Sequence, residues 1–256
     1  MLTGPGTPPH MFRFGILGPF ELRDAAGAAV PFGSDRARTL LALLLLQRDQ
    51  ICSADGLIDG VWGERPPCSA RKNLQTHIWR LRRLLGRVGA ARLEGRRAGY
   101  LLSVIGGAVD LDQFEYRAAA GERLLAAGAA ADGSVLLAEA LRLWRGQPLA
   151  DVAFGEPPAG ELVRLAERRM TVLENRIEAD LLCGRSAQVV PELRKLVAEY
   201  PYRERLYAQL MLALSRCGRQ VEALSVFSDI RSLLRREYGL DPGPALQQVQ
   251  SAILSA

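Results

Sequence analysis

The stretch between Ser69 and Leu85 constrains the fold of this chain more than any other part of its sequence. The apolar residues Leu74, Ile78 and Leu81 recur there at helical spacing, and Leu85 continues the same face. The other faces of this stretch carry basic, amide and hydroxyl side chains. The pattern predicts an amphipathic helix that packs on a core along one side and exposes positive charge along the other.

Positive charge is concentrated around this predicted helix. Residues 65–97 hold ten basic residues and one acidic residue, Glu94, whereas the whole chain has a formal net charge of +5. Residues 1–109 contain 15 basic and 8 acidic residues (+7), and residues 110–256 contain 18 and 20 (−2). Charge confined in this way is typical of a surface that meets phosphate groups.

The segments before this helix predict a small domain that mixes strands and helices. Short extended runs over residues 12–31, separated by Gly-containing turns, indicate an antiparallel sheet. Two helices follow over residues 35–48 and 54–62, and Ser53 is the predicted N-cap of the second.

The amphipathic helix and the segment after it complete the domain. Ser69 is its predicted N-cap and Gly86 its predicted end. Two strands over residues 91–94 and 100–104 flank Gly95–Gly99, which is predicted to be the tip of a β-hairpin.

Beyond Gly106-Gly107, the predicted domain boundary, almost the whole chain is expected to be helical. The predicted helices lie near residues 111–127, 133–145, 161–183, 186–199, 203–217, 220–238 and 243–255. Cys183-Gly184-Arg185 recurs as Cys217-Gly218-Arg219 at an offset of 34, and apolar positions repeat at the same offset. Thirty-four residues is the period of tetratricopeptide (TPR) repeats, so this half is predicted to be TPR-like.

Several classes of protein are disfavoured by what the sequence lacks. The longest apolar run, residues 40–46, is far too short to span a bilayer, and the loose tail over residues 1–10 does not resemble a signal peptide. Four Cys without a CxxC pair predict neither a disulfide framework nor a metal site, and no cofactor is expected. The sequence offers two His and no paired catalytic groups, so it is not expected to be an enzyme.

The polar faces of the 69–85 helix suit the major groove of double-stranded DNA. Arg can bind two acceptors of guanine, and Gln or Asn can do the same for adenine. The 54–62 helix completes a helix-turn-helix, and Arg96 and Arg97 at the hairpin tip could reach the adjacent backbone or minor groove. The alternative is a solvated basic face on a packing helix, but the nearby capped helix and basic hairpin favour DNA binding.

The sequence resembles the Streptomyces antibiotic regulatory proteins, whose N-terminal domain is a winged helix-turn-helix of the response-regulator output type. The matching stretches there are Phe14-Gly15-Ile16-Leu17-Gly18-Pro19, residues 40–45, Leu57-Ile58-Asp59, Val61-Trp62-Gly63, Pro66-Pro67, Leu74-Gln75-Thr76, Arg80-Leu81-Arg82-Arg83 and Gly99-Tyr100. The second half is similar to the bacterial transcriptional activation domain of that family. The matching stretches there are residues 140–146, Pro148-Leu149-Ala150-Asp151, residues 201–206, Gly218-Arg219-Gln220, Glu222-Ala223-Leu224 and residues 238–243.

The resemblance implies a fold class and a domain order. It implies an α+β winged helix-turn-helix domain over residues 11–106 and an all-α, TPR-like activation domain over residues 110–256, after a flexible tail over residues 1–10. It also implies an activator of a secondary-metabolite gene cluster that binds direct repeats in promoter DNA and recruits RNA polymerase holoenzyme. The protein is then expected in the cytoplasm, on the nucleoid, with a second copy beside it on DNA.

The resemblance also assigns roles to residues. The implied base contacts are Gln75, Thr76 and Arg80. The implied phosphate or positioning contacts are Arg36, Arg38, Lys72, Asn73, Trp79, Arg82 and Arg83, and the wing residues are Arg96 and Arg97. Trp79 departs from the family pattern, and its predicted contact is either a DNA sugar or the wing. A repressor on the same DNA-binding domain and a TPR-like scaffold remain alternatives.

Overall fold

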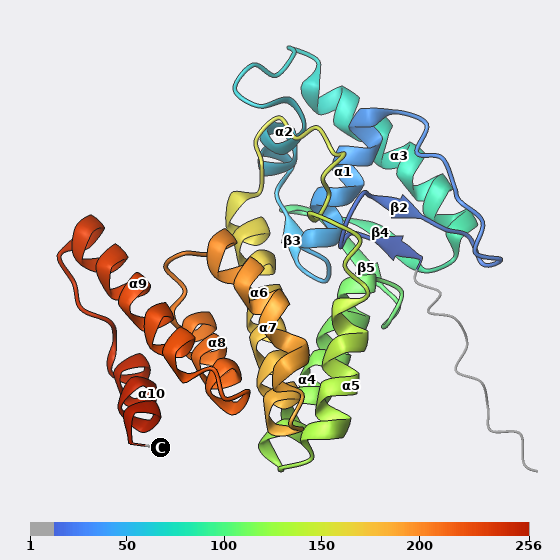
Figure 1. The fold of residues 1–256 in the computed structure, drawn as a ribbon. Coiled ribbons are helices and arrows are strands. Elements are labelled where there is room, and N and C mark those ends of the chain that lie inside the picture. Colours follow the sequence, from blue (N-terminus) through green and yellow to red (C-terminus); the bar gives the residue numbers. More distant parts are fainter. Residues whose placement is uncertain (1–12, 256) are drawn as a thin grey trace, which may run out of the picture. The chain divides into compact units, whose positions relative to one another are not determined.

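The computed structural model of the chain describes residues 13–255 (Figure 1). That range holds five short strands and ten helices, and the strands all precede the fourth helix. The predicted fold class, a winged-helix region with β-strands followed by a helical domain, is confirmed. The tail predicted over residues 1–10 lies outside the described residues.

The winged-helix region is built from three helices and two small antiparallel sheets. Its elements are β1 (Phe14–Gly15), β2 (Glu21–Leu22), α1 (Asp35–Leu46), β3 (Ile51–Cys52), α2 (Ala54–Trp62), α3 (Ala70–Val88), β4 (Ala91–Arg96) and β5 (Gly99–Val104). Strands β1 and β2 pair with each other, and the second sheet has the order β3-β5-β4. Helix α1 packs against both α2 and α3, so the helix-turn-helix stands on a common core.

The apolar face predicted for α3 is confirmed. Leu74, Ile78, Leu81 and Leu85 are each no more than 2% exposed. They pack on α1, whose leucines are buried on nearly all sides, and this burial supplies the hydrophobic free energy that holds α3 in place. The opposite side of α3 is therefore held rigidly toward solvent.

The predicted end of α3 is wrong, and its predicted N-cap is confirmed only in position. Gly86 lies inside the helix, which ends at Gly89, where the backbone has a left-handed φ of 71°. Ser69 occupies the predicted N-cap position, but its side chain makes no capping bond, because its backbone is not extended and its Oγ instead accepts a hydrogen bond from Asn73 Nδ2. The cap predicted at Ser53 is confirmed, since its Oγ accepts from the backbone N–H of Gly56.

The hairpin β4–β5 is the wing, and it is tighter than predicted. Its strands extend to Arg96 and Gly99, so the turn is made by residues 97–98 alone. Strand β3 was not predicted from the sequence, and it pairs with the start of β5. Gly99 is required there: its φ is 151°, and a Cβ would lie 1.9 Å from the carbonyl oxygen of Cys52 in β3.

Six helices of the second half agree with the predicted bounds within two residues at each end, whereas the helix predicted over residues 133–145 begins at Ala130 and ends at Leu141. The helices of this half are α4 (Asp110–Ala126), α5 (Ala130–Leu141), α6 (Ala159–Leu182), α7 (Ser186–Glu199), α8 (Glu204–Arg216), α9 (Gln220–Tyr238) and α10 (Pro244–Leu254). The repeat at an offset of 34 corresponds to two helix pairs, α6–α7 and α8–α9. Gly184 and Gly218 join the members of each pair with nearly equal left-handed φ angles of 76° and 74°.

The chain also divides into two compact units, whose bounds are separate from the domain boundary predicted at Gly106-Gly107. Unit 1 consists of the residues up to Arg117 together with Ala140–Arg168. Unit 2 consists of Ala118–Glu139 together with the residues from Arg169 onward. Within residues 13–255, no helix is long and apolar enough to cross a membrane.

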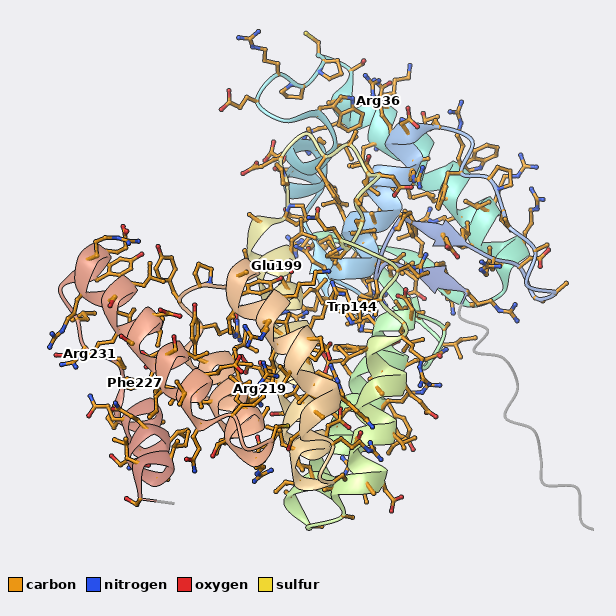
Figure 2. The ribbon with its side chains drawn as sticks, viewed as in Figure 1. Arg36, Trp144, Glu199, Arg219, Phe227 and Arg231 are labelled. Carbon is orange, nitrogen blue, oxygen red and sulfur yellow. The ribbon has the colours of Figure 1, made fainter. Side chains whose placement is uncertain are left out.

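A connector over residues 142–158 explains why unit 1 includes residues so far along the chain. This yellow stretch runs beside α1 and α2 in Figure 1. Leu149 donates its backbone N–H to the carbonyl oxygen of Gly18 at 2.8 Å. Trp144, labelled in Figure 2, packs edge-on against Phe114 with ring centroids 5.4 Å apart. The connector is thus an ordered part of unit 1.

Asp110 is the most deeply buried charge in unit 1, at 0% exposure. Its two oxygens accept hydrogen bonds from the backbone N–H groups of Ile16 and Leu17, at 2.9 and 3.0 Å. Arg145 of the connector forms an ion pair with the same carboxylate at 2.9 Å, and a second one with Glu21 at 2.5 Å. Asp110 therefore ties the N-terminal sheet, α4 and the connector together.

Unit 2 contains a comparable cluster of its own. Arg176 pairs with Asp180 at 3.0 Å and with Glu192 at 2.5 Å, and its side chain is only 14% exposed. Burial favours the neutral form of Asp180, but hydrogen bonds from Ser134, Arg176 and Arg185 outweigh it and lower the pKa of this carboxyl. The charged groups of this cluster therefore pair with one another inside unit 2.

Candidate nucleic-acid interface

The side of α3 that faces away from the core is the strongest candidate site in the molecule. We call it the outer face of α3, and it consists of Lys72, Gln75, Thr76, Trp79, Arg80 and Arg83. Every one of these side chains is exposed. Because α3 is anchored by its buried leucines, this face is presented on a rigid helix.

The three basic residues of the outer face, Lys72, Arg80 and Arg83, have no acidic partner among the described residues. Arg71, beside them on α3, pairs with Asp55 of α2 in an exposed contact of 2.7 Å. An unpaired group of cations at a surface produces a positive potential that attracts phosphate.

The three predicted base contacts, Gln75, Thr76 and Arg80, lie together on this face. The side chains of Gln75 and Arg80 are exposed. Thr76 is exposed too, but its hydroxyl donates to the carbonyl oxygen of Lys72 at 3.1 Å. Gln75 and Arg80 are the side-chain types that bind adenine and guanine edges with two hydrogen bonds. Their role in base contact stays a prediction.

The predicted phosphate and positioning residues differ in their exposure and in their hydrogen-bond partners. Lys72 points to solvent, whereas Asn73 is half-buried and donates to Ser69 Oγ at 3.1 Å. Arg82 donates through Nε to the carbonyl oxygen of Leu93 at 2.9 Å and thereby joins α3 to strand β4 of the wing. Arg82 is therefore placed to fix the angle between α3 and the wing.

The two arginines predicted at the start of α1 have different surroundings. Arg36, labelled in Figure 2, is exposed and its guanidinium lies 5.7 Å from the ring centroid of Trp62. Arg38 forms an ion pair with Asp151 of the connector and donates to the carbonyl oxygen of Phe20 at 3.0 Å. Arg38 has a structural partner, so we leave it out of the proposed interface and retain Arg36.

The wing presents one paired and one unpaired arginine. Arg96 forms an ion pair with Glu94 on the same strand at 2.5 Å, with its side chain 48% exposed. Arg97 lies in the turn, is exposed, and has no acidic partner among the described residues. Arg97 is therefore the better placed of the two for a contact with the DNA backbone.

His77 of α3 lies beside α2. Its ring lies 6.2 Å from that of Trp62. Burial lowers the pKa of His77, and the nearby charges of Arg80 and Arg36 lower it further. Arg36 of α1 and Arg80 of α3 therefore both lie close enough to His77 to disfavour its protonation.

Arg87 was not among the predicted site residues, and it extends the basic surface by one turn. Arg87 lines a groove between α3 and residues 31–34, together with Arg80 and Arg83. Its spacing of seven from Arg80 could have identified it. No group of His, Cys, Asp and Glu among residues 13–255 is arranged to hold a metal ion.

The winged helix with this outer face, followed by a helical domain, defines the class of DNA-binding transcriptional regulators. Two family models match the chain. The model described as "Transcriptional regulatory protein, C terminal" matches residues 32–102, and the "Bacterial transcriptional activator domain" matches residues 109–254.

Similar proteins narrow this class to a family. The regulatory protein DnrI of Streptomyces peucetius is 38% identical over 252 residues, which cover 95% of this chain and 92% of DnrI. The regulatory protein AfsR of Streptomyces coelicolor is 43% identical over 246 residues, which cover 95% of this chain but only 24% of AfsR. The chain belongs to the Streptomyces antibiotic regulatory protein family.

A solved structure has the same fold over most of this chain. It is that of Mycobacterium tuberculosis EmbR in complex with a low-affinity phosphopeptide, which matches with a TM-score of 0.87 and 34% sequence identity. The match covers 96% of this chain and 65% of the EmbR chain. The chain thus spans about a quarter of AfsR and about two thirds of EmbR.

Proposed function

We propose that this protein is a sequence-specific activator of transcription whose target is a secondary-metabolite gene cluster. The observation that carries the proposal is the outer face of α3, which offers exposed Gln75 and Arg80 beside cations that have no acidic partner among the described residues. Membership of the Streptomyces antibiotic regulatory protein family supports the class of target genes.

The proposal includes two copies of the protein side by side on direct repeats. One small winged helix buries only about 600–1,000 Å² on DNA, which limits the affinity of a single copy. Contact between two copies on adjacent repeats would raise the affinity through effective concentration. Residues 109–254, which match an activator domain, are the proposed surface for RNA polymerase.

Footprinting of the full-length protein on the promoters that flank its own gene, at stated salt concentrations, tests the DNA-binding part. We expect two adjacent protected segments with the same sequence in the same orientation. Protection no better than on random DNA would contradict the proposal and favour a scaffold protein.

Transcription in vitro from the protected promoter, with purified RNA polymerase holoenzyme, tests the activation part. We expect the transcript to increase with occupancy of the repeats. A transcript that falls as the repeats fill would show a repressor with the same DNA-binding domain.

A further inference from the structure

Trp79 is the one large apolar side chain on the outer face of α3, and it is 56% exposed. Its neighbours on that face are basic, amide or hydroxyl side chains. The indole lines the groove between α3 and residues 31–34, outside the core that the leucines on the other side of α3 form. Tryptophan is one of the residue types that contribute most to the free energy of binding when a partner covers the exposed side chain.

Trp79 is also held in place before any partner arrives. The guanidinium of Arg83, one turn further along α3, lies 5.0 Å from the centre of the indole ring. This cation–π contact restricts both side chains, so less conformational entropy is lost on binding. The stacked guanidinium keeps its N–H groups at its edge, where they can still donate to DNA.

We propose that Trp79 recognises the 5-methyl group of a thymine in the major groove. This inference rests on the DNA-binding function proposed above. The thymine methyl is the apolar group that the major groove displays, and apolar side chains distinguish thymine by contact with it. Trp79 lies midway along the face that carries Gln75 and Arg80, so an α3 seated in the groove brings its indole to the base edges.

Replacement of thymine by deoxyuridine, one position at a time, tests the inference because it removes only the methyl group. The site is first obtained by selection from a random duplex library with the full-length protein. We expect one thymine whose replacement weakens binding about fourfold, the effect of losing one buried methyl. In Trp79→Ala, thymine and uracil at that position should bind equally, while Trp79→Phe should keep part of the difference.

Two control variants make the test specific. Thr76→Ser removes the one methyl group of the outer face and, whatever its effect on overall affinity, should leave the fourfold thymine effect in place. Tyr116→Ala removes an aromatic side chain that is 75% exposed on α4 and should change nothing. Thermal unfolding of Trp79→Ala should match that of the parent protein, which excludes misfolding.

The possible failures are distinguishable. If the parent protein selects a site but binds it equally with uracil at every position, the inference about Trp79 is wrong and the proposed function stands. The inference is also wrong if Trp79→Ala retains the thymine effect. If no sequence is selected at all, the proposed function fails, and the inference fails with it.

Discussion

Arginine serves two opposite purposes in the two units of this protein. In unit 2, Arg176 is nearly buried between two carboxylates, and Arg203 pairs with the buried Glu174 at 2.6 Å. On the outer face of α3 in unit 1, Arg80 and Arg83 extend into solvent without an acidic partner among the described residues. The partners of an arginine, and not its presence, therefore distinguish charge that stabilises the fold from charge available to a ligand.

The difference follows from the placement of acidic residues in the sequence. Residues 65–97 contain a single acid, Glu94, and the wing uses it for Arg92 and Arg96. In unit 2, acidic residues stand within a few positions or one helix of nearly every arginine, as Glu222 does for Arg219 at 2.7 Å. A basic protein can thus have one strongly charged face and a second unit that is close to neutral.

The largest expected effect concerns the buried carboxylate of unit 1. Asp110→Ala removes the acceptor for two backbone N–H groups and leaves Arg145 without one of its partners. We expect the free energy of unfolding, measured with urea, to fall by about 3–5 kcal/mol. Asp112→Ala, which breaks the more exposed pair with Arg48, should cost no more than about 1 kcal/mol. Equal losses in the two variants would contradict the role given to Asp110.

Arg176→Ala addresses the paired arginines of unit 2. The change leaves Asp180 and Glu192 without this cation, and Arg176 is mostly buried. We expect the protein to lose about 2–3 kcal/mol of stability, less than a fully buried pair, and to bind DNA as before at temperatures where it stays folded. A loss of DNA affinity in a fully folded variant would show that Arg176 contributes to DNA binding, and would contradict the assignment of the paired arginines of unit 2 to stability alone.

Lys72→Ala is the counterpart on the outer face of α3. The side chain is exposed and unpaired, so urea unfolding should match that of the parent within about 0.5 kcal/mol. The affinity for specific and random DNA should fall alike, and the slope of log affinity against log salt should decrease by about 1. An unchanged slope would show that Lys72 makes no contact with a DNA phosphate.

The smallest expected effect is a dependence of stability on pH through His77. Its folded pKa lies below the ordinary value of 6.5, so the unfolded chain binds the proton more readily. The contribution of His77 to stability is therefore full above about pH 6.5 and declines as the pH falls toward the folded pKa. Unfolding at a series of pH values should show this decline in the parent and not in His77→Gln. The same decline in both would assign it to other groups.

The sequence predicted most of this fold because its signals were local. The bounds of α2 and the apolar face of α3 follow from Ser53 and from regularly spaced leucines. The end of α3 was misplaced because a glycine in mid-helix and one at a helix end are alike in sequence. Gly89 ends the helix because it alone takes the left-handed conformation there.

Contacts between residues that lie far apart along the chain could not be predicted from the sequence. Nothing local in residues 142–158 shows that they pack beside α1, and nothing in Arg38 shows that Asp151 pairs with it. The base-contact candidates Gln75, Thr76 and Arg80 could be placed on one face because helical periodicity fixes their positions. The ion pair of Arg38 could not be predicted because its partner lies 113 residues away.

The most direct test of the central claim is the affinity of Arg80→Ala for the selected DNA site and for a scrambled duplex at the same salt concentration. If the outer face of α3 reads sequence, binding to the selected site should weaken by about 1–3 kcal/mol, as expected for one lost pair of hydrogen bonds to guanine. The preference at one base pair should relax, and the scrambled duplex should be affected much less. An equal loss on both duplexes would show that Arg80 meets only phosphate, and no loss on either would contradict the assignment of this face as the DNA-reading surface.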